Sequence, residues 1–258
     1  MLRSSFAEWR IRIGGAAVTA ECRLSRLTRQ GLRRTQTCRM APWSAGAGAA
    51  PWQAALDALA GLLEAGAHAH ARVVLADSLV RYAVLPWNDA LVSNDEDRVF
   101  LGHRFRQMYG EVASGWDARC ERDAPGRARL ASAVDAGLVP ALAALLGKHA
   151  IDLRSAIPAL ADAVNRHRRH LDRPDAWLVC HDDGALGIAR WHDWEWMAAR
   201  SLKVDADWRD TLAAVLAREE CLHDAPGDTD TVFLDADGEP PALPGWTVVP
   251  LRAAGAAR

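Results

Sequence analysis

The sequence predicts an α/β fold of two lobes, each built on a mixed sheet that starts as a three-strand meander and is flanked by helices. Two regions, residues 8–75 and 177–251, show the same order of three strands, a helix and a strand. Turns rich in Gly and Asp separate the first strands of both regions. With 258 residues, half of them hydrophobic, the chain can bury the core of one large domain or two small lobes. We place the lobes at residues 1–172 and 173–258.

The first lobe begins with predicted strands at residues 8–13, 18–27 and 32–39, and Gly14-Gly15 forms the first turn. Pro51 then opens a helix, because proline is tolerated in the first helical turn. Its predicted inward face is Trp52, Leu56, Leu59, Leu62 and Leu63. A strand at residues 72–75 follows, and Asp77-Ser78 is a tight connection to a second buried strand at residues 79–85.

The middle of the chain is predicted to be largely helical. Asn94 caps a helix that carries Val99, Phe100, Phe105 and Met108, and a strand at residues 116–120 follows. Next we expect a helix at residues 138–146, a strand at 151–155 and a helix at 157–170. The last helix ends in Arg166, His167, Arg168, Arg169 and His170, which suits the negative pole of its dipole better than nucleic-acid binding. Asp172-Arg173-Pro174 marks the predicted hinge.

The second lobe repeats the order of the first. Strands are predicted at residues 177–180, 186–191 and 195–204, with turns at Asp182-Asp183-Gly184 and His192-Asp193. Asp207 caps a helix at residues 208–220, and strands at 231–234 and 246–251 close the lobe. Two copies of this order indicate two ribonuclease-H-like lobes, which is the arrangement of the actin-like ATPase superfamily.

One block resembles a segment of the PilM and GspL group, actin-like cytoplasmic components of type IV pilus and type II secretion machines. The matching residues are Val80, Arg81, Tyr82, Val84, Leu85, Pro86 and Trp87. Two further segments, residues 105–110 and 155–165, show a weaker similarity to the same group. The resemblance implies an actin-like fold and a partner that is an inner-membrane assembly protein, engaged through a short cytoplasmic tail. We assign Arg81, Tyr82 and Trp87 to partner binding on this basis.

Nucleotide binding by actin-like ATPases uses two strand-turn-strand loops with an acid, glycines and a small hydroxyl residue around the phosphates. The first turn here has Gly14 and Gly15 but no acid or hydroxyl before Thr19. The second turn has Asp183 and Gly184 but no Ser or Thr, and the acidic segment 235–239 would repel phosphate. These four residues are the nucleotide-site candidates, and neither ATP nor Mg²⁺ is favoured as a cofactor.

Other chemistry has little support in the sequence. His181, Asp182, Asp183, His192 and Asp193 have side chains that suit zinc or manganese, but their places in turns explain them equally well, so we predict no metal site. No Walker A loop, Gly-x-Ser-x-Gly elbow or HExxH helix is present. Five scattered cysteines argue against a disulfide framework. We therefore predict no catalytic residues.

Charge and hydropathy favour a cytoplasmic protein. No apolar run approaches the roughly 20 residues that span a bilayer, and the first ten residues lack a signal-peptide core. The net charge of −2 gives no attraction to nucleic acid, although the first forty residues are rich in arginine. That arginine run is either the solvated face of an amphipathic sheet or a patch for anionic lipid or an acidic partner.

The sequence thus predicts a non-catalytic scaffold of a pilus or secretion-type inner-membrane complex, which contacts the membrane only peripherally. An active actin-like ATPase or sugar-kinase-like phosphotransferase is the alternative. A ribonuclease-H-type nuclease is a third, which needs a carboxylate trio that the first meander does not supply. Homodimer formation stays open. Exposed tryptophans among Trp191, Trp194 and Trp196 favour binding over catalysis.

Overall fold

The computed structural model describes residues 5–28, 31–44, 50–64, 68–89, 93–121, 125–182, 184–223 and 230–252. Its helices and strands, in chain order, are β1 Ser5–Ile13, β2 Ala17–Thr28, β3 Gly31–Pro42, α1 Gln53–Leu62, β4 Ala69–Leu75, η1 Asp77–Leu79, β5 Arg81–Leu85, α2 Asn94–Tyr109, η2 Glu111–Gly115, β6 Trp116–Cys120, β7 Arg129–Asp135, α3 Leu138–Lys148, β8 Ile151–Pro158, α4 Ala159–His167, β9 Ala176–Asp182, β10 Ala185–His192, β11 Glu195–Lys203, α5 Trp208–His223, β12 Thr231–Asp235 and β13 Thr247–Pro250.

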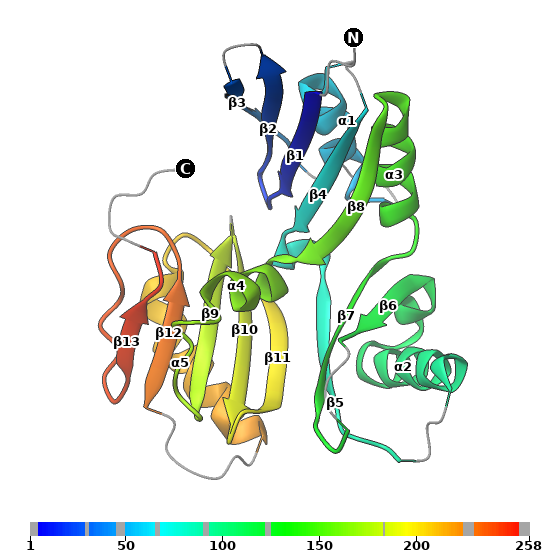
Figure 1. The fold of residues 1–258 in the computed structure, drawn as a ribbon. Coiled ribbons are helices and arrows are strands. Elements are labelled where there is room, and N and C mark those ends of the chain that lie inside the picture. Colours follow the sequence, from blue (N-terminus) through cyan, green and yellow to red (C-terminus); the bar gives the residue numbers. More distant parts are fainter. Residues whose placement is uncertain are drawn as a thin grey trace.

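Two five-stranded sheets repeat one topology, and this confirms the predicted α/β fold. Their strand orders are β3-β2-β1-β4-β8 and β11-β10-β9-β12-β13. In each sheet the first three strands form an antiparallel meander, and the last two strands add in parallel. Figure 1 shows the first lobe above the second, with the long strand β8 pointing toward the second lobe.

The first lobe has a core on one side of its sheet. Trp9, Ile11 and Ile13 of β1 alternate inward and pack with α1 and α3, because side chains of a strand point to opposite faces in turn. Pro51 lies just before the N-cap Trp52 and not in the first helical turn as predicted, whereas Leu56 and Leu59 are buried as predicted. In Figure 1, both helices lie on the same side of the sheet.

The second lobe is buried on both faces of its sheet. One face packs on α5 through Trp177, Trp208, Leu212 and neighbouring residues. The other face contributes Leu178, Trp191 and other side chains to the same core as the first lobe. Helix α4 contacts β9 and β10 as well as β4 and β8, so it joins the two sheets. This double burial explains why β9 is almost continuously apolar.

A third, smaller sheet was not predicted. It has the order β5-β7-β6, packs on α2 through Leu101 and Phe105, and lies at the lower right in Figure 1. Strand β7 was missed in the sequence, where residues 125–137 lack strict alternation. The two strands predicted on either side of Asp77-Ser78 are present and joined by the short turn η1, but they lie in different sheets: β4 belongs to the first large sheet, whereas β5 pairs with β7.

Most element boundaries differ from the predictions by a few residues, and three of these differences concern helix ends. Ser93, not Asn94, caps α2, and it forms a capping box with Glu96. Strand β8 continues through Pro158, so α4 starts at Ala159 and not at residue 157. Helix α5 extends to residue 223. The proposed lobe boundary at residues 172 and 173 stays a prediction.

Two general features of the described chain bear on its setting. Among the described residues, no helix has both the length and the apolar character that a membrane span requires. All five cysteines are free, and Cys180 is buried as an apolar filler.

Candidate functional site

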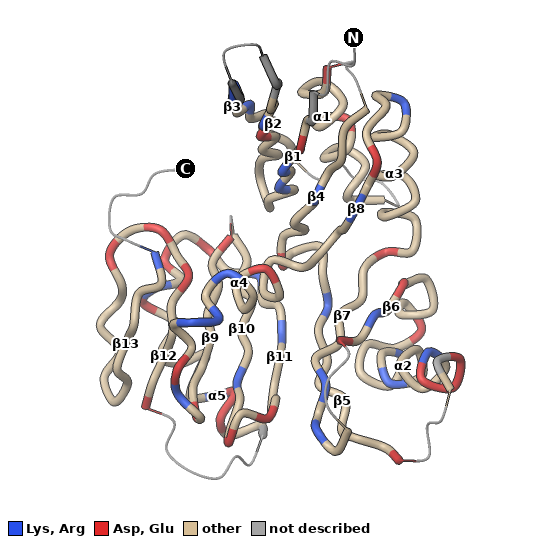
Figure 2. The backbone as a smooth tube through the Cα atoms, viewed as in Figure 1, with Lys and Arg blue, Asp and Glu red and all other residues tan. Residues whose placement is uncertain are grey.

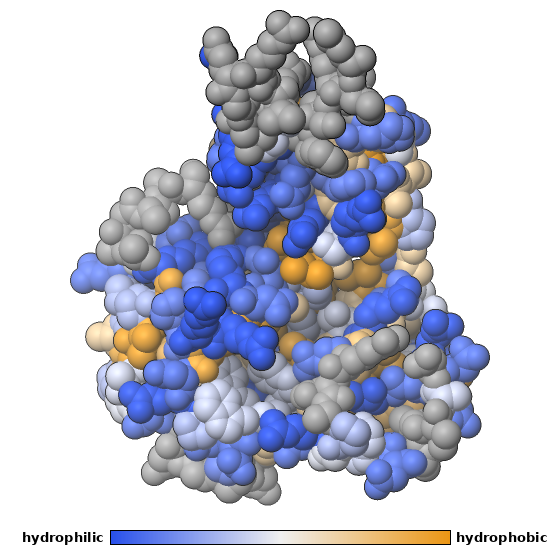
Figure 3. All heavy atoms as spheres, viewed as in Figure 1, coloured by the Kyte–Doolittle hydropathy of each residue, from blue (hydrophilic) through white to orange (hydrophobic). Residues whose placement is uncertain are grey.

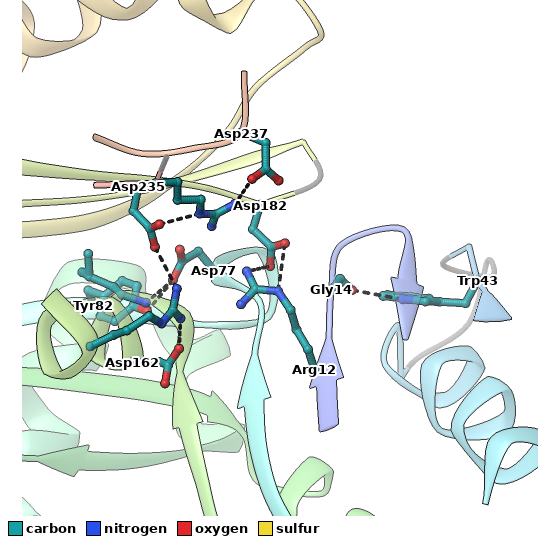
Figure 4. A network of polar contacts seen from close by, with 12 residues as sticks. Arg12, Gly14, Trp43, Asp77, Tyr82, Asp162, Asp182, Asp235 and Asp237 are labelled. Carbon is teal, nitrogen blue, oxygen red and sulfur yellow. Dashed lines mark hydrogen bonds and ion pairs between the residues drawn. The ribbon is translucent and has the colours of Figure 1, made fainter. Parts of the chain in front are cut away.

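The two turns predicted as phosphate loops approach each other between the lobes. The chain enters the first turn from Arg12 of β1 and the second from Asp182 of β9. These two side chains meet across the lobes, with Arg12 Nη2 2.9 Å from Asp182 Oδ2. A second contact joins Arg12 Nε to Asp182 Oδ1 at 3.3 Å (Figure 4). Both side chains are largely buried, so the pair is better shielded from solvent than a surface ion pair.

The candidate glycines differ in their backbone requirement. Gly184 has φ of 82°, the left-handed region that favours glycine, whereas neither Gly14 nor Gly15 has a positive φ. The Gly14 carbonyl instead accepts a hydrogen bond from Trp43 Nε1 at 3.0 Å, which fixes the first turn against the end of β3 (Figure 4). The fourth candidate, Asp183, lies outside the described residues.

Asp77 is a buried acid with a strongly raised pKa at the junction of the lobes. It follows β4, is fully buried, and accepts hydrogen bonds from the Tyr82 hydroxyl and from the Leu160 amide (3.3 Å). Burial raises the pKa of Asp77 to about 7, and the nearby charge of Asp182 also raises it, while the Tyr82 hydrogen bond opposes both. The carboxyl group is therefore largely protonated below neutral pH.

The Asp77 carboxyl packs directly on the second lobe. A Cβ atom at Gly187 of β10 would lie 2.3 Å from Asp77 Oδ2, so only glycine fits there. No hydrogen-bond partner of Asp77 Oδ2 is present among the described residues. The contact makes Asp77 a buried part of the lobe interface.

A second polar cluster surrounds Asp235, at the end of β12. Arg252 Nε donates to Asp235 Oδ1 at 2.5 Å and Arg252 Nη1 lies 2.9 Å from Asp237 Oδ1. Arg166 of α4 contacts both Asp162 and Asp235 (Figure 4). Burial alone would raise the pKa of Asp235, but the hydrogen bond and charge of Arg252 lower it below its usual value. The acidic segment thus forms an internal ion-pair network.

The three residues assigned to partner binding lie in different environments. Tyr82 has no exposed surface, so its assignment to direct partner contact was wrong: its ring is part of the core and its hydroxyl holds Asp77. Trp87 is half-buried and donates to Asp89 Oδ1 at 2.6 Å. Arg81 is half-buried, and its Nη1 donates to the main-chain carbonyls of Val80 (2.9 Å) and Ser78 (3.3 Å).

Arg81 lies in a groove where three parts of the molecule meet. The groove has a volume of about 690 Å³. One wall comes from the loops of the first five-stranded sheet and η1, a second from β5 with the end of α2, and a third from β10 and β11. Its charged and polar lining includes Asp77, Ser78, Arg81, Tyr109, Arg200, Ser201 and Lys203. Gly15 and Gly184 line it as well, and Leu79 and Leu202 add apolar surface. Trp87, at the opposite end of β5, is outside this lining.

Hydrogen bonds and an ion pair fix the positions of the groove walls. Ser201 Oγ donates to the Val80 carbonyl at 2.7 Å, and Tyr109 donates to the Tyr82 carbonyl at 2.9 Å. Arg200 pairs with the buried Glu219 at 3.2 Å. The first two contacts connect the segment around Val80 and Tyr82 with β11 and α2, and the Arg200–Glu219 pair joins β11 to α5, so the groove has a defined shape.

Three of the five side chains that were considered as metal ligands make other contacts. His181 stacks on Trp208 with ring centroids 4.6 Å apart, Asp182 pairs with Arg12, and His192 contacts Asp175. Among the described residues, no three His, Cys, Asp or Glu side chains are grouped to hold a metal ion. Trp194 is the exposed tryptophan of that region, at 49%.

Sequence reasoning missed Arg12, Asp77 and Gly187 as site residues. A buried acid directly after an apolar strand was a usable signal at Asp77, but turn chemistry explained it too. Nothing local marks Arg12 or Gly187, because their partners lie in the other lobe.

Comparison with known proteins identifies the fold of this chain through solved structures. No protein-family model matches the chain, and no curated protein matches it in sequence. Among solved structures, the cytoplasmic domain of EpsL, an inner membrane component of the type II secretion system of Vibrio cholerae, is similar with a TM-score of 0.57 and 11% identity. The match covers 97% of this chain and 91% of that one. The chain has an actin-like ATPase fold.

Two further structures agree with this assignment. The PilM-PilN type IV pilus biogenesis complex matches with a TM-score of 0.58 and 12% identity, over 88% of this chain and 80% of that one. A Bacteroides thetaiotaomicron protein with an actin-like ATPase fold and unknown function matches with a TM-score of 0.55 and 7% identity, over 88% and 81%. The resemblance to the PilM and GspL group therefore extends from one sequence block to the whole fold.

Proposed function

We propose that this protein is a non-catalytic, cytoplasmic scaffold of a pilus or secretion-type assembly complex, and that its groove at Arg81 binds an extended peptide from an inner-membrane partner. The likeness to the EpsL cytoplasmic domain and to the PilM-PilN complex supports the class of assembly. The groove supports the mode of binding.

The placement of Arg81 is the observation that carries the proposal. Its neighbours in the groove include the cations Arg200 and Lys203, whereas the acid there, Asp77, is buried and largely protonated below neutral pH. Arginine presents five N–H donors, and the hydrogen bonds described for Arg81 use only Nη1. A peptide carbonyl or carboxylate can therefore bind its guanidinium, while apolar peptide side chains contact Leu79 and Leu202.

The same site disfavours nucleotide turnover. Catalysis on a Mg-nucleotide needs a carboxylate that orients the metal between the two turns. The first turn has none, and the Asp182 carboxylate is paired with Arg12. Asp235 is likewise paired with Arg252. We infer that neither carboxylate is available without breaking a partly buried ion pair.

The test compares Arg81→Ala with wild type in thermal melting and in co-purification with membrane proteins of the native host. Arg119→Ala, on the exposed side of β6, is the matched control. We expect Arg81→Ala to melt within a few degrees of wild type and to lose the membrane protein that wild type and Arg119→Ala retain. A variant that melts early and still binds would make Arg81 a fold residue and refute its role in docking.

A further inference from the structure

The sheet of the first lobe is covered by helices on one side only. In Figure 1, α1 and α3 lie behind it, and the side toward the viewer has no helix over it. We call this side the open face. The strand register places charged and polar side chains in two rows across it: Gln36, Arg23, Glu8, His70 and Asp152 in one row, and Cys38, Glu21, Arg10, Arg72 and Ser155 in the next.

A broad hollow of about 1010 Å³ lies over the open face. Among the described residues that line it, the positively charged side chains are Arg23, Arg34, Arg72 and Arg154, the negatively charged one is Glu8, and His70 lies beside them. Figure 2 shows basic positions along β1, β4 and β8, and Figure 3 shows a largely hydrophilic surface in this region. The hollow is thus strongly basic in a chain whose net charge is −2.

Arg23 pairs with Glu21 at 2.6 Å, but the other three arginines of the hollow keep most of their hydrogen-bond donors for a ligand. Arg72 contacts Glu8 at 3.4 Å, yet its side chain is 70% exposed. Arg34 and Arg154 are exposed, and Arg154 Nη2 lies 3.0 Å from His70 Nε2, which adds no negative charge. Such arginines offer planar forks for carboxylates.

We propose that the hollow on the open face binds an acidic segment of a protein partner, at a surface distinct from the groove at Arg81. A protein segment fits better than a bilayer, because the basic residues lie in a recess and share the face with Glu8, Glu21 and Asp152. Nucleic acid fits less well, since none of the described residues that line the hollow is a Phe, Tyr or Trp that could stack on bases.

The experiment measures the affinity of a labelled peptide of alternating Glu and Thr by fluorescence anisotropy at low salt. The test variant is Arg72→Glu with Arg154→Glu. The control is Arg98→Glu with Arg119→Glu, whose arginine side chains are 71% and 73% exposed. We expect about a tenfold weaker affinity in the test variant and none of this loss in the control. A Lys-Thr peptide should show the reverse preference, and bind the test variant better than wild type.

Thermal melting checks that the test variant folds, and Arg34→Gln with Arg154→Gln is the milder substitute. Equal affinity of wild type and test variant for the Glu-Thr peptide would overturn the proposal. It would also fail if wild type ignored the peptide but sedimented with phosphatidylglycerol vesicles, or if a single-stranded oligothymidine displaced the peptide. The first of these outcomes would assign the face to lipid, and the second to nucleic acid.

Discussion

Protonation of Asp77 should control the stability of the lobe interface. The carboxyl is fully buried, and its pKa is raised from 3.8 to about 7 by burial and by Asp182. A group whose folded pKa is raised favours the folded state when it is protonated. Its contribution is complete below about pH 4 and is lost as the pH rises from about 4 to 7.

The size of the effect follows from linkage. Three pKa units of about 1.4 kcal/mol each correspond to roughly 4 kcal/mol in total. Between about pH 5 and pH 8, this single group should lower the free energy of unfolding by about 2–3 kcal/mol. Asp77→Asn keeps an oxygen that can accept from Tyr82 and from the Leu160 amide, and it has no titratable proton.

Urea unfolding of wild type and Asp77→Asn at several pH values measures this directly. The wild type should lose about 2–3 kcal/mol relative to Asp77→Asn between about pH 5 and pH 8. Arg12 and Asp182 face the same region and form an ion pair that is present in both proteins, so a comparison of the two isolates the contribution of Asp77. Parallel stability profiles for the two proteins would refute the reasoning, because they would show that Asp77 is ionised in the folded state.

Two further substitutions and one titration test the Gly187–Asp77 contact, the Arg252–Asp235 ion pair and the lack of nucleotide binding. Gly187→Ala should cost about 1–3 kcal/mol in urea unfolding, because its Cβ would overlap the Asp77 carboxyl, whereas Gly102→Ala on the open side of α2 should be neutral or slightly stabilising; equal effects would contradict the close approach. Arg252→Ala should cost about 1–3 kcal/mol, since it removes the strongest partner of buried Asp235; an unchanged melting temperature would contradict that role. Isothermal titration with Mg-ATP should give no heat, because Asp182 is paired with Arg12, and a micromolar affinity would favour the ATPase alternative.

The repeated topology could be predicted because it depends on local sequence patterns, namely the alternation of apolar residues in strands and the residues of the turns. Alternation in β1 and the turn at Gly14-Gly15 specify the first meander, and the almost fully apolar β9 specifies a doubly covered strand. The sheet β5-β7-β6 was not predictable in this way. Arg129 begins β7 but pairs with Asp97 of α2, so its charge is explained only by tertiary contact.

The candidate site was even harder to predict from the sequence, because its residues depend on tertiary contacts. Arg12 is one of many arginines in the first forty residues, and only the approach of β9 from the other lobe gives it a partner. The burial of Tyr82 could have been expected from its place in an alternating strand, since Arg81 and Tyr82 point to opposite sides of β5. The resemblance block was read as one surface, although only alternate residues of a strand share a face.

Docking at Arg81 is tested most directly by site-specific photocrosslinking in the native host. A photoreactive residue at position 81 should yield a crosslink to an inner-membrane protein, and the same residue at position 119, on the exposed side of β6, should not. The account predicts that the crosslink from position 81 persists in Asp182→Asn, which removes the carboxylate that pairs with Arg12. A crosslink pattern that is equal at positions 81 and 119, or absent from both, would contradict a docking groove at Arg81.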